Sequence, residues 1–431
     1  IHDQLGGGFH RYATDARWLV PHFEQMLYDN AQLGRAYTHA WWLTGDPGYR
    51  DVAEATLGYM SRELTLPDGA FAASQDADTD GEEGGTFTWD AAEIRDLLGP
   101  AGPAFEAAYD VTDRGNWESR TILQRVTPRG DAAAEAGLAA SRAVLLAHRS
   151  GRPQPARDDK ALAAWNGLAI AAFADAGRSG DPAHLARAVA AADAILGGLY
   201  ADGRLKRSWK DGRATGEGVL EDYACLADGL LALYEATFEE RWFVTARTLM
   251  ETVLDRFTDP AGGFFDTADD HERLITRPKD VQDNATPSGG AMATHVLIRL
   301  AALTGEGRYR TAAERAIATI SPLVTRYPTA FAKWLSAIDL ALSDIVEIAI
   351  VADPDKPGAA ELLAVATAGL RPARVVAMAA DPTSSAVPLL EGRTRLRDRP
   401  TAYVCRNFAC QIPVTDPDAL AAQLREHTAA L

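Results

Sequence analysis

The sequence predicts a mainly helical fold, a ring of helical hairpins of the (α/α)6 toroid type followed by a small α/β unit. Three observations lead to this prediction. A helix–turn–helix junction recurs along the chain, the first helix of each pair is apolar on nearly every face, and the residue pattern changes after Asp344. We therefore assign residues 1–344 to a helical barrel domain and residues 345–431 to a small C-terminal α/β domain.

The recurring junction is short and acidic, and it separates two apolar helical stretches each time. It begins at Gly45, Gly180, Glu239 and Gly305. An Asp-Pro pair or a glutamate favours a helix start there, because a carboxylate caps free N–H groups and proline suits the first turn. The last three junctions are about 60 residues apart, which fits one hairpin plus a long connection. The first interval is about twice as long, so residues 67–157 hold a degenerate unit or an insertion.

The two helices of each pair differ in character. The first helices are small and apolar, at 161–174, 223–236 and 289–303. A helix that is apolar on most faces is buried on most faces, as an inner ring requires. Their partners alternate apolar and charged positions as an outer ring would, at 52–63, 185–196 and 245–256. A final apolar helix is expected at 327–342.

A turn followed by an aromatic or apolar residue comes after each second helix. It occurs at 66–71, 200–205 and 259–265, and the opening Gly6-Gly7-Gly8-Phe9 matches it. By this internal symmetry, we expect the first hairpin of the ring to lie outside this sequence.

The C-terminal domain alternates strands with helices, which predicts a small α/β unit. Strands are expected at 345–351, 374–378 and 401–405, and helices at 359–370 and 417–426. Four residues separate Cys405 from Cys410, so these thiols could form a disulfide or half of a metal site. We interpret them instead as buried, inert cysteines.

The composition excludes several classes of protein. The formal net charge is −17, which argues against a nucleic-acid partner because a phosphate backbone requires a basic face. No apolar run reaches the roughly 18 residues of a membrane span. Three cysteines are too few for a disulfide framework or a four-ligand zinc site, which favours a reducing, cytoplasmic setting.

The densest group of polar and aromatic residues precedes and begins the first helix. On a helix that starts near Pro21, Glu24 and Tyr28 share a face. We interpret Glu24 as an acid, His22 or His10 as a base or proton donor, and Trp18 as an aromatic platform. The alternative is that Glu24 only complements the helix dipole and that His22 is a packing residue. The candidate residues of this group are His10, Arg11, Tyr12, Trp18, His22, Glu24 and Tyr28.

Residues 72–85 form an acidic loop that imitates the start of a calcium-binding loop. The spacing then fails, because the twelfth position is Phe87 instead of a glutamate. We predict no metal site here. We expect the loop to supply one or two carboxylates to the pocket, with Asp76 catalytic and Asp78 in binding. A solvated acidic turn is the alternative.

Further polar residues gather where the other inner helices begin. Capping explains one Asp, Asn or Ser per helix, but not whole groups of them. Carboxylates and amides that bind hydroxyls, with indoles that stack on sugar faces, suit a carbohydrate site. The residues are Asp159 and Asp222 as catalytic candidates, and Lys160, Trp165, Asn166, Glu221, Tyr223, Asn284 and Ser288 as binding candidates.

Several of these stretches resemble the thioredoxin-domain-containing family that includes the spermatogenesis-associated thioredoxin-like proteins. The resemblance covers nearly the whole chain. It implies a six-hairpin barrel similar to N-acylglucosamine 2-epimerases and six-hairpin glycosidases, and an N-terminal thioredoxin-like domain in the full-length protein. We expect that domain outside this sequence, so no thiol-redox function is carried over. The stretches include Gly6-Gly7-Gly8-Phe9-His10-Arg11-Tyr12, His22-Phe23-Glu24, Ser74-Gln75-Asp76-Ala77-Asp78, Asp158-Asp159-Lys160, Trp165-Asn166-Gly167, Glu221-Asp222-Tyr223 and Cys405-Arg406-Asn407-Phe408-Ala409-Cys410.

We therefore expect a carbohydrate-active enzyme that takes a small sugar-like ligand and needs no cofactor or metal. An epimerase-like or isomerase-like enzyme would use His10 or His22 as general base or acid, with Glu24 orienting it.

A glycoside hydrolase would instead need two carboxylates across the pocket, for example Glu24 or Asp76 against Asp159 or Asp222. The competing prediction is a non-catalytic barrel that binds a sugar, or regulates, beside a thioredoxin-like redox domain.

Overall fold

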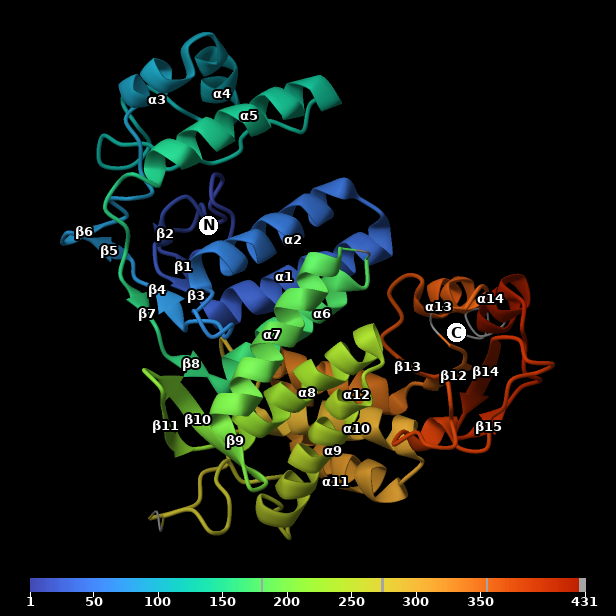
Figure 1. The fold of residues 1–431 in the computed structure, drawn as a ribbon. Coiled ribbons are helices and arrows are strands. Elements are labelled where there is room, and N and C mark those ends of the chain that lie inside the picture. Colours follow the sequence, from blue (N-terminus) through green and yellow to red (C-terminus); the bar gives the residue numbers. More distant parts are fainter. Residues whose placement is uncertain (180, 273–274, 354–355, 426–431) are drawn as a thin grey trace. The chain divides into compact units, whose positions relative to one another are not determined.

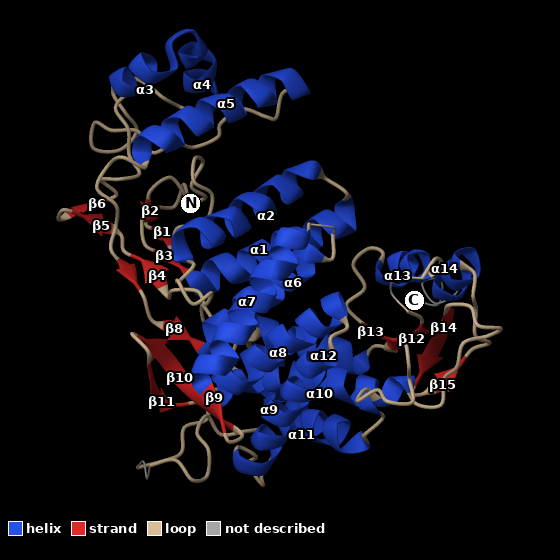
Figure 2. Ribbon diagram, in the orientation of Figure 1, coloured by secondary structure: helices blue, strands red, loops and turns tan. Residues whose placement is uncertain are grey.

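The chain forms two compact units built mainly from helices. The computed structural model describes residues 1–179, 181–272, 275–353 and 356–425. The first unit consists of residues 1–38 and 46–161, and the second of residues 39–45 and 162–431 (Figure 1). The mainly helical class, with short strands between the helices, is confirmed (Figure 2).

The first unit holds the α1–α2 hairpin and a separate group of three helices. Asp46 caps α2 by accepting a hydrogen bond from the Gly48 N–H group, as the recurring junction predicts. The helices are α1 (Leu27–Thr44, whose last turns belong to the second unit), α2 (Pro47–Tyr59, continued by a π-helical turn at Met60–Leu64), α3 (Ala91–Leu98), α4 (Gly102–Tyr109) and α5 (Ala132–Arg149). Helices α3, α4 and α5 bury Trp89, Ile94, Phe105 and Leu145. They occupy the long interval between the first two junctions.

Short antiparallel strands connect these helices. Strands β1 and β2 pair with each other, β3, β4 and β7 form a three-stranded sheet, and β5 pairs with β6. Their bounds are β1 (Tyr12–Ala13), β2 (Pro21–His22), β3 (Gln25–Met26), β4 (Ser74–Gln75), β5 (Asp78–Thr79), β6 (Glu82–Glu83) and β7 (Arg157–Asp158).

The prediction that a helix starts near Pro21 is wrong. Pro21 lies in β2, and the helix begins at Leu27. The backbone of Gln25 and Met26 pairs with Gln75 and Ser74, which keeps it extended. Glu24 therefore lies outside α1, and neither its shared helix face with Tyr28 nor its first-turn dipole role applies.

The second unit contains three further hairpins. Helix α6 packs on α7, α8 on α9 and α10 on α11, and α12 packs on α10. The helices are α6 (Ala163–Gly177), α7 (Pro182–Leu199), α8 (Leu220–Thr237), α9 (Glu240–Arg256), α10 (Gly289–Thr304), α11 (Gly307–Arg326) and α12 (Ala332–Leu342). Strands β9 (Tyr200–Ala201), β10 (Arg204–Lys210) and β11 (Arg213–Glu217) form a hairpin between α7 and α8, and β8 (Ala161–Leu162) lies at the unit boundary.

The first helix of each of these pairs is buried along most of its length, as predicted. Close approach of backbones makes this possible. A Cβ added at Gly229 of α8 would lie 2.4 Å from the Gly167 carbonyl oxygen of α6, and one added at Gly289 of α10 would lie 2.8 Å from the Glu221 nitrogen. Glycine is therefore required where these helices meet.

The C-terminal segment forms a four-stranded sheet within the second unit. Its strand order is β13-β12-β14-β15, with β12 parallel to β13 and antiparallel to β14. Ile348, Ile350 and Val404 of the sheet share a core with Leu362 and Leu420 of the two helices. The elements are β12 (Val346–Val351), α13 (Ala359–Thr367), β13 (Arg374–Ala379), β14 (Thr401–Arg406), β15 (Ala409–Cys410) and α14 (Pro417–Arg425). The predicted strand and helix positions agree with these bounds, and the domain division at residue 344 stays a prediction.

The interpretation of Cys405 and Cys410 as inert thiols is wrong. The two residues are directly opposite each other in β14 and β15 and form a disulfide. Cys225 is a free, buried thiol, and burial raises its pKa.

Among the helices of the described residues, none combines the length and the apolar character that crossing a bilayer requires.

We predict that Gly229→Ala lowers the free energy of unfolding by about 1–3 kcal/mol, because the new methyl group overpacks the α6–α8 contact. Urea titrations followed by far-UV circular dichroism would measure this. Gly197→Ala is the matched control, since a Cβ there meets nothing within 4 Å in α7. That change should raise stability by about 0.5–1 kcal/mol through helix propensity. Equal effects of the two substitutions would contradict the close packing.

Candidate functional site

A group of polar side chains lies just before α1 and in its first turn, within the first unit. Two backbone pairings bring it together. The Arg11 N–H group donates to the Glu24 carbonyl oxygen at 2.9 Å, and Tyr12 stands opposite His22 in the β1–β2 pair. We call Arg11, His22, Glu24, Tyr28, Asp29 and Glu83 the α1 cluster.

Glu24 and His22 form the centre of the α1 cluster. The Arg11 guanidinium donates to the Glu24 carboxylate at 3.1 Å, and His22 Nε2 lies 3.7 Å from the same oxygen. His22 Nδ1 lies 2.8 Å from Oε1 of Glu83 in β6. A carboxylate at that distance favours the tautomer with the proton on Nδ1, because only an N–H can donate to it. His22 Nε2 is then the basic nitrogen.

Asp29 adds a carboxyl group that holds its proton close to neutral pH. Burial raises its pKa to about 7, Arg11 opposes the shift and Glu24 adds to it. Its Oδ2 atom is buried and accepts no hydrogen bond from the described residues. Arg11 also donates a hydrogen bond to the Tyr28 hydroxyl, whose pKa is raised by burial. Perturbed groups of this kind are enriched at sites of acid–base chemistry.

One exposed aromatic ring borders the α1 cluster, since the Tyr12 ring lies 5.1 Å from the His22 ring, and a second exposed ring, Trp18, lies in the loop between β1 and β2. Tyr12 is 51% exposed and Trp18 is 63% exposed. Trp18 has a φ of 60°, a left-handed conformation that is rare for a bulky residue. The Asp15 carboxylate holds the loop between β1 and β2 in shape by accepting from the N–H groups of Arg17, Leu19 and Val20.

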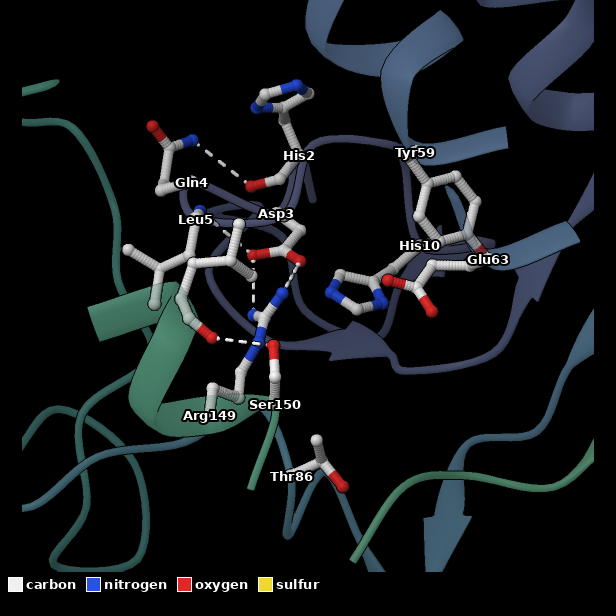
Figure 3. Close-up of polar contacts among 12 residues, drawn as sticks. His2, Asp3, Gln4, Leu5, His10, Tyr59, Glu63, Thr86, Arg149 and Ser150 are labelled. Atoms are coloured by element: carbon white, nitrogen blue, oxygen red, sulfur yellow. Dashed lines mark hydrogen bonds and ion pairs between the residues drawn. The ribbon is translucent and has the colours of Figure 1, made fainter. Parts of the chain in front are cut away.

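His10 lies in the interior of the first unit instead. Its Nδ1 is 2.8 Å from the Phe23 carbonyl oxygen, and its ring is only 5% exposed. Figure 3 shows it beside a buried ion pair, in which Arg149 donates to both oxygens of Asp3 at 2.9 and 2.6 Å. His10 and Asp3 border a cavity of about 40 Å³, far smaller than the several hundred Å³ of a typical ligand pocket. This placement gives His10 a structural role.

The other candidate residues of the first unit form ion pairs within their own turns or are exposed. Asp159 pairs with Arg157 at 2.5 Å, and Lys160 pairs with Asp158 at 2.9 Å. Asp76 and Asp78 are both exposed. Of the acidic loop, it is Glu83 that reaches His22. Sequence reasoning expected a carboxylate from this loop but did not select Glu83.

In the second unit, Asp222 is a buried helix cap. Its carboxylate accepts from the Val219 N–H group at 3.0 Å and from the Ala164 N–H group at 3.2 Å, which links α8 to α6. Arg207 pairs with both Asp222 and Glu221, at 3.2 and 2.7 Å. Burial raises the pKa of Asp222 to about 7, against the opposing effect of Arg207 and the backbone donors.

The remaining candidates of the second unit are mostly bound within the fold. The buried Tyr223 hydroxyl accepts from the Leu205 N–H group at 2.9 Å, and the buried Asn166 side chain donates to the Leu162 carbonyl oxygen at 3.0 Å. Ser288 caps α10, Trp165 is half-buried and Asn284 is exposed. The convergence of Glu24, Asp159 and Asp222 at one opening stays a prediction.

Three residues that sequence reasoning did not select take part in these groups: Asp29, Glu83 and Arg207. Asp29 and Glu83 each belong to a motif that was recognised, beside the residues chosen from it. Arg207 lies in a strand without any such signal, because only the β10–β11 hairpin brings it to the start of α8.

We predict that the buried histidines His2 and His10 weaken the native state as the pH is lowered from about 7 to 4, an effect that the buried carboxyl groups of Asp29 and Asp222 oppose because their pKa is raised to about 7. Burial lowers the pKa of His2 and of His10 to about 4, so the unfolded chain binds protons in this range while the native state does not. For a shift of this size the loss reaches about 3 kcal/mol per histidine. Urea midpoints measured at several pH values would show it. Relative to the unaltered protein, His10→Gln should gain stability as the pH falls through this range, whereas His271→Gln at a partly exposed site should follow the unaltered protein. A pH dependence of His10→Gln identical to that of the unaltered protein would contradict the buried, neutral assignment.

Comparison with known proteins gives relatives in sequence and weaker likenesses in structure. No family model matches the chain. The solved structures similar to it include a sugar epimerase from a ruminal bacterium (TM-score 0.49, 12% identity, 74% of this chain and 66% of that chain) and the cellobiose 2-epimerase of Spirochaeta thermophila (TM-score 0.36, 16% identity, 74% and 79%).

The curated relatives match almost the whole chain. Spermatogenesis-associated protein 20 of Mus musculus and of Homo sapiens are each 34% identical to it over 469 residues, which covers 97% of this chain. An uncharacterized Caenorhabditis elegans protein, B0495.5, is 27% identical over 464 residues. The chain spans 59%, 60% and 63% of the lengths of these three relatives. The predicted resemblance is therefore confirmed in this form: the chain is similar in sequence to spermatogenesis-associated protein 20 along nearly its whole length.

Proposed function

We propose that the α1 cluster is the acid–base site of an enzyme that epimerises or isomerises a neutral sugar. One observation carries this proposal. A histidine oriented by a carboxylate and a carboxyl group with a pKa of about 7 belong to the same cluster, next to the exposed Tyr12 ring. Moving a proton onto and off a sugar carbon or oxygen requires a base that can accept it and an acid that can return it.

His22 is the proposed base. Glu83 accepts the Nδ1 proton and leaves Nε2 with a free electron pair. Glu24, 3.7 Å from Nε2, stabilises the imidazolium that forms once a proton has been taken. Glu83 is a positioning residue, since it acts through His22.

Asp29 is the proposed second proton-transfer group. A carboxyl group with a pKa of about 7 is available both as the acid and as the carboxylate at neutral pH. Asp29 Oδ2 is buried and has no hydrogen-bond partner among the described residues, so a substrate hydroxyl would complete its bonding once the side chains covering it move aside. Arg11, which bonds Glu24 and Tyr28, supplies further donors for sugar oxygens.

The two exposed rings suit a sugar ligand. Tyr12 offers a flat apolar face beside the polar groups of the cluster, and Trp18 offers a second exposed face in the β1–β2 loop. A sugar has a matching arrangement of groups, with apolar C–H faces on its ring and hydroxyl groups around the edge. The neutral-sugar class follows from the mixture of acidic and basic groups in the cluster.

The hydrolase alternative receives less support from the contacts. It paired Glu24 or Asp76 with Asp159 or Asp222. Asp159 is held by Arg157, and Asp222 is engaged with two backbone N–H groups and Arg207. Carboxylates in such roles are poorly suited to protonate a leaving group.

We also infer that the chain is a member of the family that contains spermatogenesis-associated protein 20, which the match along 97% of this chain supports. The thioredoxin-like domain expected in the full-length protein stays a prediction.

We predict that the protein exchanges a sugar C–H hydrogen with solvent when it is incubated with monosaccharides and disaccharides in D₂O, followed by NMR. His22→Gln and Asp29→Asn should each lower the rate by about 100-fold or more, because each removes a proton-transfer group. In Asp29→Asn, the part of the pH dependence near 7 that belongs to this carboxyl group should also be lost.

Glu82→Gln is the matched control, since Glu82 is the exposed neighbour of Glu83 in β6. It should leave the rate unchanged. Turnover that persists in both His22→Gln and Asp29→Asn would disprove the site. Sugar binding by the unaltered protein with no exchange for any sugar would favour the non-catalytic barrel.

A further inference from the structure

The Cys405–Cys410 disulfide closes a tight hairpin at the edge of the C-terminal sheet. Arg406 is opposite Ala409, and the two turn residues Asn407 and Phe408 have φ values of 47° and 63°. Two consecutive left-handed residues are typical of a type I′ turn, in which asparagine is favoured at the first position. The disulfide therefore joins the second pair of residues outside this turn, next to the Arg406–Ala409 pair.

The hairpin forms one wall of a cavity of about 780 Å³ in the second unit. Arg406, Asn407 and Phe408 line it, together with residues at the end of α10. The Phe408 ring packs on Gly305, where an added Cβ would lie 3.0 Å from its Cζ atom. The Phe408 N–H group donates to the Glu347 carboxylate at 2.9 Å. The conformation of the hairpin thus determines the shape of this wall.

A buried guanidinium contacts both sulfur atoms. Arg393 Nη2 lies 3.3 Å from Cys405 Sγ and 3.2 Å from Cys410 Sγ, and the residue is only 8% exposed. Its Nη1 donates to the Glu391 carbonyl oxygen, and Glu347 interacts with it electrostatically. A disulfide sulfur is neutral and accepts hydrogen bonds only weakly. A cation in this position stabilises a thiolate much more than the disulfide.

The two sulfur-bearing residues differ in accessibility. Cys405 is 1% exposed, and Cys410 is exposed. An incoming thiolate therefore reaches Cys410, and Cys405 is the leaving group beside Arg393. A leaving thiol with a lower pKa leaves faster.

We propose that this disulfide is a thiol–disulfide exchange site, at which a dithiol attacks Cys410 Sγ and releases Cys405 as a thiolate paired with Arg393. This inference is independent of the function proposed for the α1 cluster.

The exchange takes place in two balanced steps. One thiolate of the dithiol bonds to Cys410 Sγ, the Cys405–Cys410 bond breaks, and its electron pair passes to Cys405. The second thiolate of the dithiol then attacks the mixed disulfide and releases Cys410, which takes up a proton. The dithiol is oxidised to its disulfide, and the protein disulfide is reduced to the Cys405 thiolate and the Cys410 thiol. Reduction removes the covalent link behind Phe408 and so changes the wall of the cavity.

The test is reduction of the native protein by dithiothreitol, with quenching by N-ethylmaleimide and intact-mass measurement over time. We expect both hairpin cysteines to be labelled while the buried Cys225 stays unlabelled. Arg393→Met should slow reduction about threefold to tenfold, because the leaving thiolate loses its counter-ion. Arg393→Lys keeps the charge and should stay closer to the unaltered rate.

Arg406→Met is the matched control, since Arg406 lines the same cavity but pairs with Asp344 at 3.0 Å. It should not change the rate. Incubation with glutathione and peptide mapping should place the mixed disulfide on Cys410. Reduction that requires denaturant, glutathione on Cys405, or equal rates for folded Arg393→Met and the unaltered protein would overturn the proposal. If Arg393→Met does not fold, the reduction rate of Arg393→Lys and the cysteine that carries glutathione still test the proposal.

Discussion

Direct backbone contact between α6 and α8 is the constraint on which the second unit depends. Gly167 and Gly229 face each other with no side chain between them, and Gly289 brings α10 equally close to the start of α8. Helices at this separation bury nearly all of their surface, which explains their small and apolar composition. The same closeness makes the polar residues at their first turns part of the packing. Asp222 spans from α8 to an N–H group of α6 and thereby links two helices.

The first unit positions its polar groups differently, because extended backbone segments hold them instead of helix starts. Residues 11–26 fold back on themselves and on β4, and this arrangement places His22 and Glu24 side by side. The buried Asp3–Arg149 pair joins the start of the chain to the end of α5. A buried charge is tolerated only with a partner, so Asp3 and Arg149 depend on each other. His10 packs beside them as a neutral ring, apart from the half-buried His22.

Burial divides the polar residues of this chain into two kinds. Asp222, Asn166 and Tyr223 have their hydrogen bonds completed by the fold, which suits stability. In Asp29, by contrast, one carboxyl oxygen is buried without a partner in the described structure. An incomplete polar group is costly for folding, and such a cost is commonly retained where a ligand completes the bonding. This difference, more than residue type, directs attention to the start of α1.

The sequence by itself determined the elements that depend on local chemistry. Acidic junctions with Asp-Pro or glutamate marked helix starts, apolar runs marked the inner helices, and alternating strands and helices marked the C-terminal sheet. Tertiary structure decided what depends on pairing between distant segments. Pairing with β1 and with β4 kept Pro21–His22 and Gln25–Met26 out of the helix, the β14–β15 register joined two cysteines thought to be inert, and the β5–β6 pair brought Glu83 rather than Asp76 to His22. The periodicity of apolar and polar residues in the sequence indicates on which face of its own helix or strand a residue lies. It contains no information on which remote backbone supplies the hydrogen bonds, and those bonds determine where the polar side chains meet.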